Sequence, residues 1–321
     1  MGLKIRGVPN IFSNSTEDGQ VLKSFGIRRV PSEDDDTIVS LKKSDEYVVD
    51  AAGDGDYTTI AAALAELGAS SGTIRVLAGN YTITSNISLG ANQSIVGSGY
   101  GTNITTTSNI TMITLTGNRS AIYMCRIDGN NTGSSQVGVV VTGDECVVKD
   151  CWITQMGDRG MTIGGNRCVV EGCRIEDCTD TCVYVSGDHL FMSDTIIDNS
   201  AENGMHLNGA SDGSVVGCRI ENHGEHGIEC DSTAHFCISG CRIFSNGDNN
   251  NNGDGIEFGA GCHENVVTGC HIGNNDGNGI TDGDGNNHRQ CVVGNVVYNN
   301  EDNEIVQNGA GDGVFADNVT A

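Results

Sequence analysis

A five-residue segment recurs along the chain from residue 121 to the C-terminal end. Two typical copies read EGCRI at 171–175 and VGCRI at 216–220. When the copies are aligned on their third residue, that residue falls at positions 125, 151, 173, 195, 218, 241, 270, 295 and 318, which gives steps of 22 to 29 residues. Self-similarity at such a period is typical of stacked structural repeats, and it constrains the fold more than any local propensity does.

Each repeat also carries a strand-like stretch that follows a glycine, such as GMTI at 160–163 and GIEC at 227–230. Apolar and polar residues alternate there with the period of a β-strand, and no helical period occurs inside the repeat. No proline follows Pro31, as expected where nearly every backbone N–H donates to a neighbouring strand. Three short strands in a coil of about 22 residues predict a parallel β-helix, an all-β fold whose coils rise about 4.8 Å each.

Six of the fourteen cysteines occupy the aligned position of the repeat, and we expect them to stack as a ladder inside the β-helix: Cys125, Cys151, Cys173, Cys218, Cys241 and Cys270. Asn295 and Asn318 continue this column. Neighbouring Cα atoms would lie close enough for disulfides, but a continuous ladder cannot pair all its members. We therefore expect small buried thiols. No CxxC pair is present, so the cysteines predict no metal site.

The composition of the chain changes near residue 46. Residues 1–46 contain both prolines and carry 7 basic and 8 acidic residues, a charge of −1, whereas 47–321 carry 10 basic and 34 acidic residues, a charge of −24. We predict an N-terminal arm at 1–46, either a flexible tail or an adaptor segment that orders on a partner. The β-helix would occupy 47–321 and begin with a helix at about 58–67 that covers the open end of the solenoid, with Thr58 or Asp56 as its cap.

The segments DGDYTTI at 54–60, IRVLAGNY at 74–81 and IVGSG at 95–99 resemble those of the pectin-lyase-like right-handed β-helix superfamily. This superfamily includes pectate lyases, pectin methylesterases, polygalacturonases and bacteriophage tailspikes. The resemblance covers about residues 47–321. It implies a right-handed, single-stranded parallel β-helix with a short N-terminal arm and a capping helix, closest in architecture to tailspike and appendage proteins.

No catalytic motif of these enzymes carries over to this chain. The paired aspartates of polygalacturonases are absent, and HGEHG at 223–227 is only a loose echo of their Gly-His-Gly motif. The Arg-x-Pro-x-x-Arg motif of pectate lyases cannot occur in a β-helix without proline. The resemblance therefore implies the fold and leaves the activity open, because this scaffold hosts many functions.

The middle residue of each post-glycine strand should point outward, which predicts the column Val140, Thr162, Tyr184, His206, Glu229, Glu257, Thr281 and Val306. Tyr184, His206, Glu229 and Glu257 would then form a candidate acid/base patch, in which repulsion between the stacked Glu229 and Glu257 raises one pKa. The turn acids Asp180, Glu202, Glu225 and Asp254 flank this patch and could add a Ca²⁺ site, although the sequence predicts no resident cofactor. A solvated acidic sheet face is the alternative interpretation.

A second outward column follows the cysteine ladder: Arg126, Trp152, Arg174, Ile196, Arg219, Arg242 and His271. Acidic residues two positions further on predict surface ion pairs, and Trp152 between Arg126 and Arg174 suits cation–π packing. This column could be a purely structural ladder, a protein interface or a glycan-binding platform. Insertions at 129–137 and 245–254 stretch two coils, and loops on a rigid scaffold often bind ligands.

The composition of the chain argues against several classes of function. The formal net charge of −25 argues against nucleic-acid binding and disfavours a polyanionic glycan. The sequence has no long apolar run that would insert into a membrane and no N-terminal signal-peptide pattern. We expect a virion structural protein assembled in the host cytoplasm: a homotrimeric spike, fibre or capsid-bound appendage that contacts other virion proteins through 1–46 and attaches to a host-surface glycan. The alternative is a polysaccharide lyase or glycoside hydrolase that uses the acid/base patch.

Overall fold

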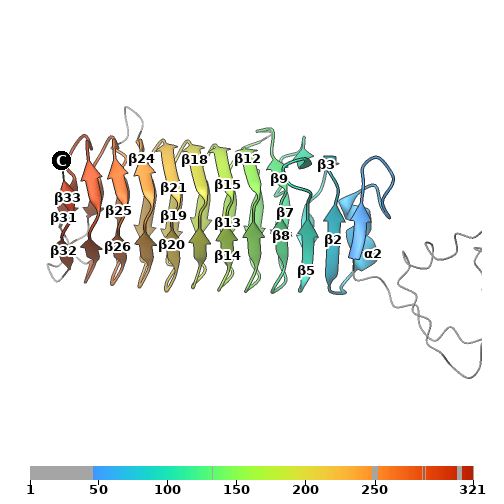
Figure 1. Ribbon diagram of the computed structural model, residues 1–321, viewed down its shortest axis with the longest axis horizontal. Helices are drawn as coiled ribbons and strands as arrows, with labels where there is room; N and C mark the ends of the chain where they lie inside the picture. The colour runs from blue at the N-terminus through green and yellow to red at the C-terminus, as the bar shows by residue number, and fades with distance from the viewer. Residues whose placement is uncertain are drawn as a thin grey trace, which may run out of the picture. The chain divides into compact units, whose positions relative to one another are not determined.

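The computed structural model describes residues 46–320 except 132, 248–251, 284, 286 and 309–312, and shows three parallel sheets wound into a solenoid (Figure 1). A complete coil contributes one strand to each sheet, and each strand inside a sheet pairs with the strands of the coils before and after it. The expected N-terminal arm lies outside the described residues apart from Glu46, which begins the first strand.

Sheet A contains twelve strands in the order β1-β2-β5-β8-β11-β14-β17-β20-β23-β26-β29-β32. Their bounds are β1 (Glu46–Val49), β2 (Gly72–Val76), β5 (Gln93–Val96), β8 (Ala121–Tyr123), β11 (Val147–Lys149), β14 (Val169–Glu171), β17 (Phe191–Ser193), β20 (Ser214–Val216), β23 (Cys237–Ser239), β26 (Val266–Thr268), β29 (Cys291–Val293) and β32 (Val314–Ala316).

Sheet B contains eleven strands. They are β3 (Gly79–Ile83), β6 (Thr102–Thr106), β9 (Arg126–Asp128), β12 (Trp152–Met156), β15 (Arg174–Cys178), β18 (Ile196–Ser200), β21 (Arg219–His223), β24 (Arg242–Phe244), β27 (His271–Gly273), β30 (Val296–Tyr298) and β33 (Val319–Thr320).

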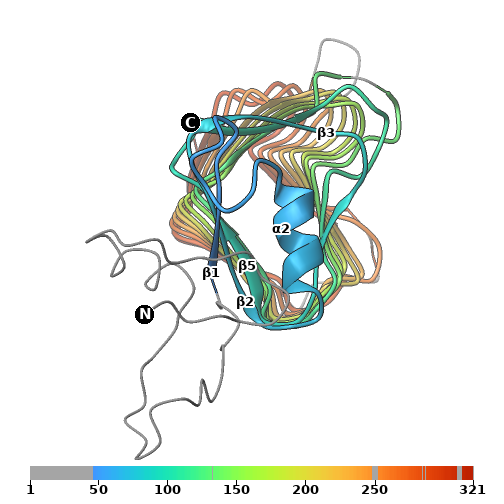
Figure 2. The ribbon, with the colours of Figure 1, turned by 90° about the vertical axis from the view of Figure 1, so that its right-hand side faces the viewer.

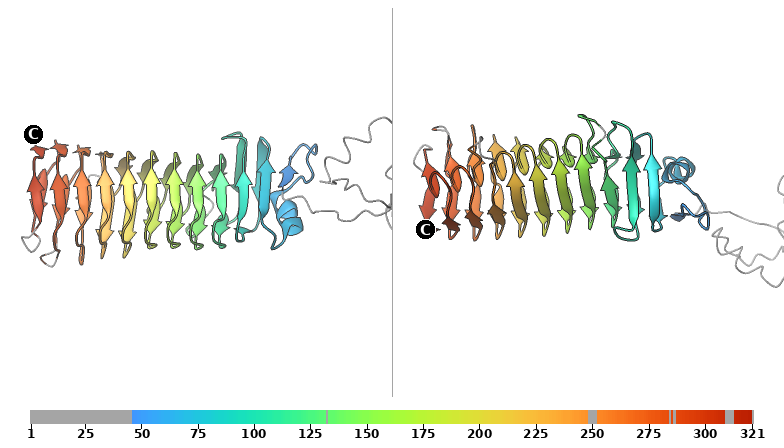
Figure 3. Two further views of the ribbon diagram at one scale, coloured as in Figure 1. Left: turned by 60° about the horizontal axis from the view of Figure 1, so that its bottom comes forward. Right: turned by 90° about the horizontal axis from the view of Figure 1, so that it is seen from above.

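Sheet C contains ten strands. They are β4 (Ile87–Leu89), β7 (Ile113–Leu115), β10 (Val139–Val141), β13 (Met161–Ile163), β16 (Val183–Val185), β19 (Met205–Asn208), β22 (Ile228–Asp231), β25 (Ile256–Phe258), β28 (Ile280–Asp282) and β31 (Ile305–Gln307). Figure 3 shows the even stacking of the coils from two further sides. The β-helical fold expected from the repeats is thereby confirmed.

The interior of the solenoid is filled by one apolar column from each sheet. In sheet B the column runs through Ile127, Ile153, Ile175, Ile197, Ile220, Ile243 and Ile272, all of which are fully buried. Burying one such side chain contributes about 1.5–3 kcal/mol to folding, and the repeat gives every coil its own share. Because the inward positions are fixed, the alternate residues of the same strands must face outward.

The cysteine ladder also lies where the repeat places it. Cys125, Cys151, Cys173, Cys218, Cys241 and Cys270 are all buried, and all fourteen cysteines are free thiols. Asn295 continues the column and is buried; its Oδ1 accepts from the backbone N–H of Cys270 at 2.9 Å, and Oδ1 of Asn318 accepts from the N–H of Asn295 at 3.0 Å.

One helix, α2 (Ile60–Leu67), covers the N-terminal mouth of the solenoid (Figure 2). Ile60, Ala63 and Leu67 face the core, and Gly68 ends the helix as expected. The N-cap is Thr59, whose side chain accepts from the N–H of Ala62, rather than Thr58 or Asp56. Asp56 instead accepts from the N–H of Val48 at 2.9 Å, so its carboxylate serves the turn before the helix.

The helices among the described residues include none with the length and apolar character needed to cross a bilayer.

Candidate functional site

The outward column of sheet C has the composition that its sequence pattern predicts. The ladder aligns Val140, Thr162, Tyr184, His206, Glu229, Glu257, Thr281 and Val306 as direct neighbours. The four residues of the expected acid/base patch are therefore consecutive on four adjacent strands. Each of them is partly buried.

His206 is the centre of this patch. Its Nε2 lies 3.1 Å from Oδ2 of Asp231, and its Nδ1 lies 3.5 Å from Oε2 of Glu229. The two carboxylates belong to the same strand, β22, two residues apart, so the pleat puts both on the outer face. Among the described residues, His206, Glu229 and Asp231 are the one group of three His, Cys, Asp or Glu side chains whose ligand atoms all lie within 4.8 Å of one another.

Glu229 has the environment of a carboxyl group that holds its proton more tightly than usual. Burial is the largest cause of its raised pKa, the charge of Asp231 adds to it, and the His206 and His226 side chains oppose it. Glu257 contributes only a small part, so the expected repulsion between stacked glutamates is not the main cause. Asn203 Nδ2 donates to Oε2 of Glu229 at 2.7 Å and fixes the orientation of the carboxyl group.

Glu257 pairs with a histidine rather than with Glu229. Nε2 of His226 lies 2.9 Å from Oε2 of Glu257, and this hydrogen bond is the main cause that lowers the pKa of Glu257. The N–H of Asp254 donates to Nδ1 of His226 at 3.0 Å, so the neutral ring carries its proton on Nε2. Burial acts to lower the pKa of His226, but Glu257 and its acidic neighbours outweigh burial and raise it.

Tyr184 contacts His206 within the patch and Arg159 from the preceding coil. Its ring packs edge-on against His206 at 5.3 Å between centroids, and the Arg159 guanidinium lies 4.2 Å from its ring centre on the other side. Arg159 Nε also lies 3.4 Å from Oδ1 of Asp180. These contacts restrain the phenol ring and the imidazole.

Three of the four turn acids influence one another. Burial is the largest cause of the raised pKa of Glu202, and the charges of Asp180 and Glu225 add to it. Asp254 is buried, and its Oδ1 accepts from the backbone N–H and the side-chain amide of Asn278 at 2.6 and 3.1 Å. Its carboxylate therefore supports the turn.

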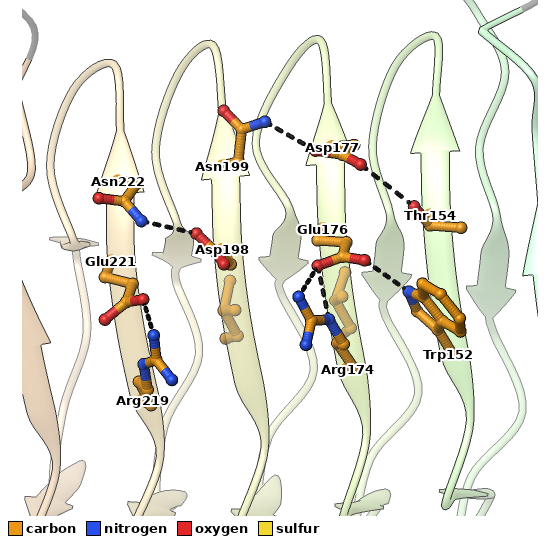
Figure 4. A network of polar contacts seen from close by, with 12 residues as sticks. Trp152, Thr154, Arg174, Glu176, Asp177, Asp198, Asn199, Arg219, Glu221 and Asn222 are labelled. Carbon is orange, nitrogen blue, oxygen red and sulfur yellow. Dashed lines mark hydrogen bonds and ion pairs between the residues drawn. The ribbon is translucent and has the colours of Figure 1, made fainter.

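The outward column of sheet B forms a second candidate site around the single tryptophan (Figure 4). Trp152 pairs with Arg126 on one side and Arg174 on the other, as predicted, and the guanidinium carbons lie 4.3 and 6.0 Å from its ring centre. Trp152 Nε1 donates to Oε1 of Glu176 at 2.7 Å, and Tyr100 packs edge-on against the indole at 5.6 Å. Tyr100 is about half exposed, at 49%.

Ion pairs within single strands accompany this column. Arg126 pairs with Asp128 at 2.7 Å, Arg174 with Glu176 at 2.5 Å, and Arg219 with Glu221. Figure 4 shows the polar chain continuing beyond them toward the ends of the strands. The predicted side-by-side stripes of arginine and acid are confirmed, and each pair joins residues two positions apart on one strand.

A groove of about 560 Å³ runs along the turns where sheet B passes into sheet C. Its lining is polar and comes from successive coils: Asn131, Gln155, Asp177, Cys178, Thr179, Asn199, Ser200, Ala201, Asn222, His223, Gly224, Ser245 and Gly247. Asn131 belongs to the first insertion, while Ser245 and Gly247 belong to the second, whose residues 248–251 lie outside the described part of the chain. The two insertions therefore mark the two ends of the groove.

Hydrogen bonds join residues of the groove to one another and to sheet B, the sheet that carries Trp152. Thr154 Oγ1 lies 3.4 Å from Oδ2 of Asp177, and Asn199 Nδ2 donates to Oδ1 of Asp177 at 2.7 Å. Asn222 Nδ2 donates in the same way to Oδ1 of Asp198 at 2.9 Å (Figure 4). Asp177, Asn199 and Asn222 therefore line the groove with hydrogen-bonded amide and carboxylate groups.

Sequence reasoning missed Asp231, Asn203, Tyr100 and the groove. Asp231 follows Glu229 by two residues, so extending the strand alternation by one step would have found it. Asn203 and Tyr100 lie in turns, where the repeat does not predict the direction of a side chain. Asp177 (φ 56°) and Asn199 (φ 55°), which line the groove, lie near the ends of β15 and β18 in the left-handed backbone conformation, so the strand period does not place their side chains.

The family model described as the right handed β-helix region matches residues 111–249 and 164–321, which together cover more than half of the chain. The chain therefore belongs to this family, and the predicted right-handed winding is confirmed. No curated protein matches the chain in sequence.

Several solved structures share the fold. ORF18 of Geobacillus virus E2 matches 78% of this chain and 52% of its own, at 17% identity and a TM-score of 0.57. The pectate lyase Pel9A matches 86% and 77%, at 15% identity and a TM-score of 0.60. Tailspike protein 2 from the Escherichia coli O157:H7 bacteriophage CAB120 matches 77% and 38%, at 15% identity and a TM-score of 0.57. The chain thus spans about half or less of the two viral proteins, and at these identities the likeness shows the fold alone.

Proposed function

We propose that this chain is the β-helical part of a virion appendage and binds a host-surface glycan in the groove between sheets B and C. The observation that carries this proposal is the polar groove bounded by the two insertions, with the Trp152 and Tyr100 rings on the adjoining face. Side-chain amides and carboxylates offer paired donors and acceptors for sugar hydroxyls, and aromatic rings can cover the apolar faces of sugar rings. A tailspike protein of the E. coli bacteriophage HK620, solved in complex with a hexasaccharide, shares the fold at 15% identity and a TM-score of 0.53, and this supports the proposal.

The negative charge of the chain limits the kind of glycan that the groove could bind. Asp177 lines the groove, Asp198 and Glu176 lie beside it, and the formal charge of the chain is −25. A polyanionic glycan would therefore be repelled. A neutral glycan fits this proposal best.

Sheet A supports the proposal of an assembled spike, a homotrimer whose residues 1–46 contact other virion proteins. One of its two outward columns carries no charged residue from β11 to β32: Val147, Val169, Phe191, Ser214, Cys237, Val266, Cys291 and Val314. Phe191 and Val314 are 43% and 53% exposed. On so acidic a chain, this uncharged apolar stripe is where copies could approach with little repulsion and with a matching coil pitch.

Glycan binding can be tested with Trp152 as the reporter, because it is the only tryptophan of the chain. A panel of neutral oligosaccharides should change its emission, and a uronic-acid polymer should not. Asn199→Ala should weaken binding roughly three- to tenfold, since one hydrogen bond contributes about 1 kcal/mol. Asn208→Ala on sheet C is the matched control. Equal affinity in both variants would place the ligand elsewhere.

Assembly can be tested by light scattering on the full chain and on a chain that begins at Tyr47. A mass near three chains supports the trimer, and its loss on removal of 1–46 would put the contacts in the arm. Phe191→Asp on sheet A and Ile196→Asp on sheet B distinguish the two faces, and only the first should break the trimer. A monomer at all concentrations would overturn the spike proposal.

A second candidate function is cleavage of the glycan by the patch on sheet C. The observation that favours it is Glu229, half-buried, with a raised pKa and beside His206, which is the environment of a general acid. Glu229→Gln and His206→Ala should each reduce depolymerisation at least about 100-fold, with Glu171→Gln on sheet A as the control. Retained activity in both variants would rule out this site.

A further inference from the structure

We propose that His206, Glu229 and Asp231 bind one divalent transition-metal ion on the outer face of sheet C. The proposal goes beyond glycan binding and does not depend on it. The three ligand atoms already lie within 4.8 Å of one another, and the shortest approach is 3.1 Å between Nε2 of His206 and Oδ2 of Asp231. Donor atoms around one ion are about 3 Å apart when each lies 2.0–2.2 Å from it, so small side-chain rotations complete the site.

The backbone holds the three ligands in one place. Glu229 and Asp231 alternate along β22 with the buried Cys230 between them, and His206 is the direct ladder partner of Glu229 on β19. Two rigid strands therefore set the spacing, and no loop has to move. Sites built on strands hold their ligands more accurately than sites built on loops.

Neighbouring side chains orient the ligands. Asn203 Nδ2 donates to Oε2 of Glu229 at 2.7 Å, which leaves the other carboxylate oxygen available. The ring of Tyr184 packs edge-on against the imidazole of His206. Supporting contacts of this kind usually account for a 10- to 100-fold effect on metal affinity.

The donor set selects the class of ion. One imidazole and two carboxylates suit Zn²⁺ and Mn²⁺, whereas Ca²⁺ and Mg²⁺ prefer oxygen ligands alone. Glu257, the ladder neighbour of Glu229 on the next coil, adds negative charge close by, which favours a cation. The side chains of His206, Glu229 and Asp231 keep 18%, 24% and 37% of their surface exposed, so the ion would retain open positions for water or a sugar hydroxyl.

The competing arrangement is the His206 ring held between the two carboxylates with no metal. Calorimetric titration of the chelator-treated full chain with ZnCl₂ and, separately, MnCl₂ distinguishes the two. We expect one ion per chain, with affinity reduced at least tenfold in His206→Gln and in Asp231→Asn. His271→Ala, an exposed histidine on sheet B, is the matched control and should bind as the unaltered chain does.

An optical measurement tests metal binding independently of the calorimetric heat. Co²⁺ added in place of Zn²⁺ should give a visible absorption band that His206→Gln abolishes, and melting curves should show that each variant remains folded. No stoichiometric binding of either ion, or binding that His206→Gln leaves unchanged, would overturn the proposal. Glycan binding in the groove would stand in either case.

Discussion

The backbone N–H of Ser200 donates to Nδ1 of His223 on the following coil at 3.2 Å, inside the corner between sheets B and C. Nε2 of His223 faces the carbonyl oxygen of Ile197 at 3.3 Å, so the buried ring is neutral with its proton on Nε2. Burial lowers the pKa of His223 to about 3. The same corner continues as an asparagine ladder, in which Asn246 and Asn275 accept from the backbone of the preceding coil.

This relationship predicts how stability depends on pH. The unfolded histidine has a pKa of roughly 6.5, above the folded value, so between these values only the unfolded chain takes up the proton. The contribution of His223 is complete above about pH 6.5 and falls by up to about 1.4 kcal/mol per pH unit on acidification toward pH 3. His223→Asn should extend the asparagine ladder and reduce this slope in urea unfolding curves.

The control for this prediction is His189→Asn, which removes an exposed histidine. That variant should keep the pH dependence of the unaltered chain. An equally steep loss of stability in His223→Asn would show that other groups cause it.

The cysteines should fall into two reactivity classes. Twelve are buried, and burial raises the pKa of Cys125 to about 12, so its reactive thiolate is scarce near neutral pH. Cys237 and Cys291 on sheet A are partly exposed. Titration of the native chain with a thiol-reactive chromogenic disulfide should give a fast phase of two thiols, which the Cys237→Ser/Cys291→Ser double variant removes. Rapid labelling of many more thiols would contradict the closed interior.

Gly227 marks a point where two coils approach too closely for a side chain. A Cβ there would lie 2.6 Å from the carbonyl oxygen of Gly255 and 2.6 Å from Cγ2 of Ile243. Gly227→Ala should destabilise the chain by about 1–3 kcal/mol, measured as a lower melting temperature. Gly164→Ala is the matched control, because its nearest contact would be Ser186 Oγ at 3.7 Å. Equal effects of the two substitutions would argue against the stated coil spacing.

The helix α2 should be needed to keep the solenoid end closed. Leu67 is 1% exposed against the core, so Leu67→Asp should cost at least about 3 kcal/mol and expose strand edges that aggregate. Ala65→Asp on the exposed side of the same helix should leave melting temperature and solubility nearly unchanged. Aggregation of both variants to the same degree would mean that helix propensity, rather than coverage of the end, is what matters.

The sequence predicts the fold well because one register is repeated many times. Once Cys173 is placed inward, the inward or outward position of Arg174, Ile175 and Glu176 follows from alternation, and the next coil repeats the assignment. For this reason the columns through His206 and Trp152 are correct residue by residue.

The sequence predicts less well which side chains pair with one another and which residue caps the helix. Glu229 was expected to be perturbed by Glu257, but His226 from a turn pairs with Glu257, and burial is the main influence on Glu229. The cap of α2 differs by one position because Asp56 binds the backbone of β1. These outcomes depend on where a side chain reaches after the strand ends, which the period of two does not determine.

The two insertions that mark the ends of the groove fix its length as a whole number of coils. From Asn131 through Gln155, Asp177, Asn199 and Asn222 to Ser245 there are five coil steps, about 24 Å at the strand spacing. The number of coils between the insertions therefore sets the length of the ligand that the proposed groove site can hold. Deleting one repeat between them would shorten the bound ligand by one step of about 4.8 Å and leave the chemistry of every remaining step the same.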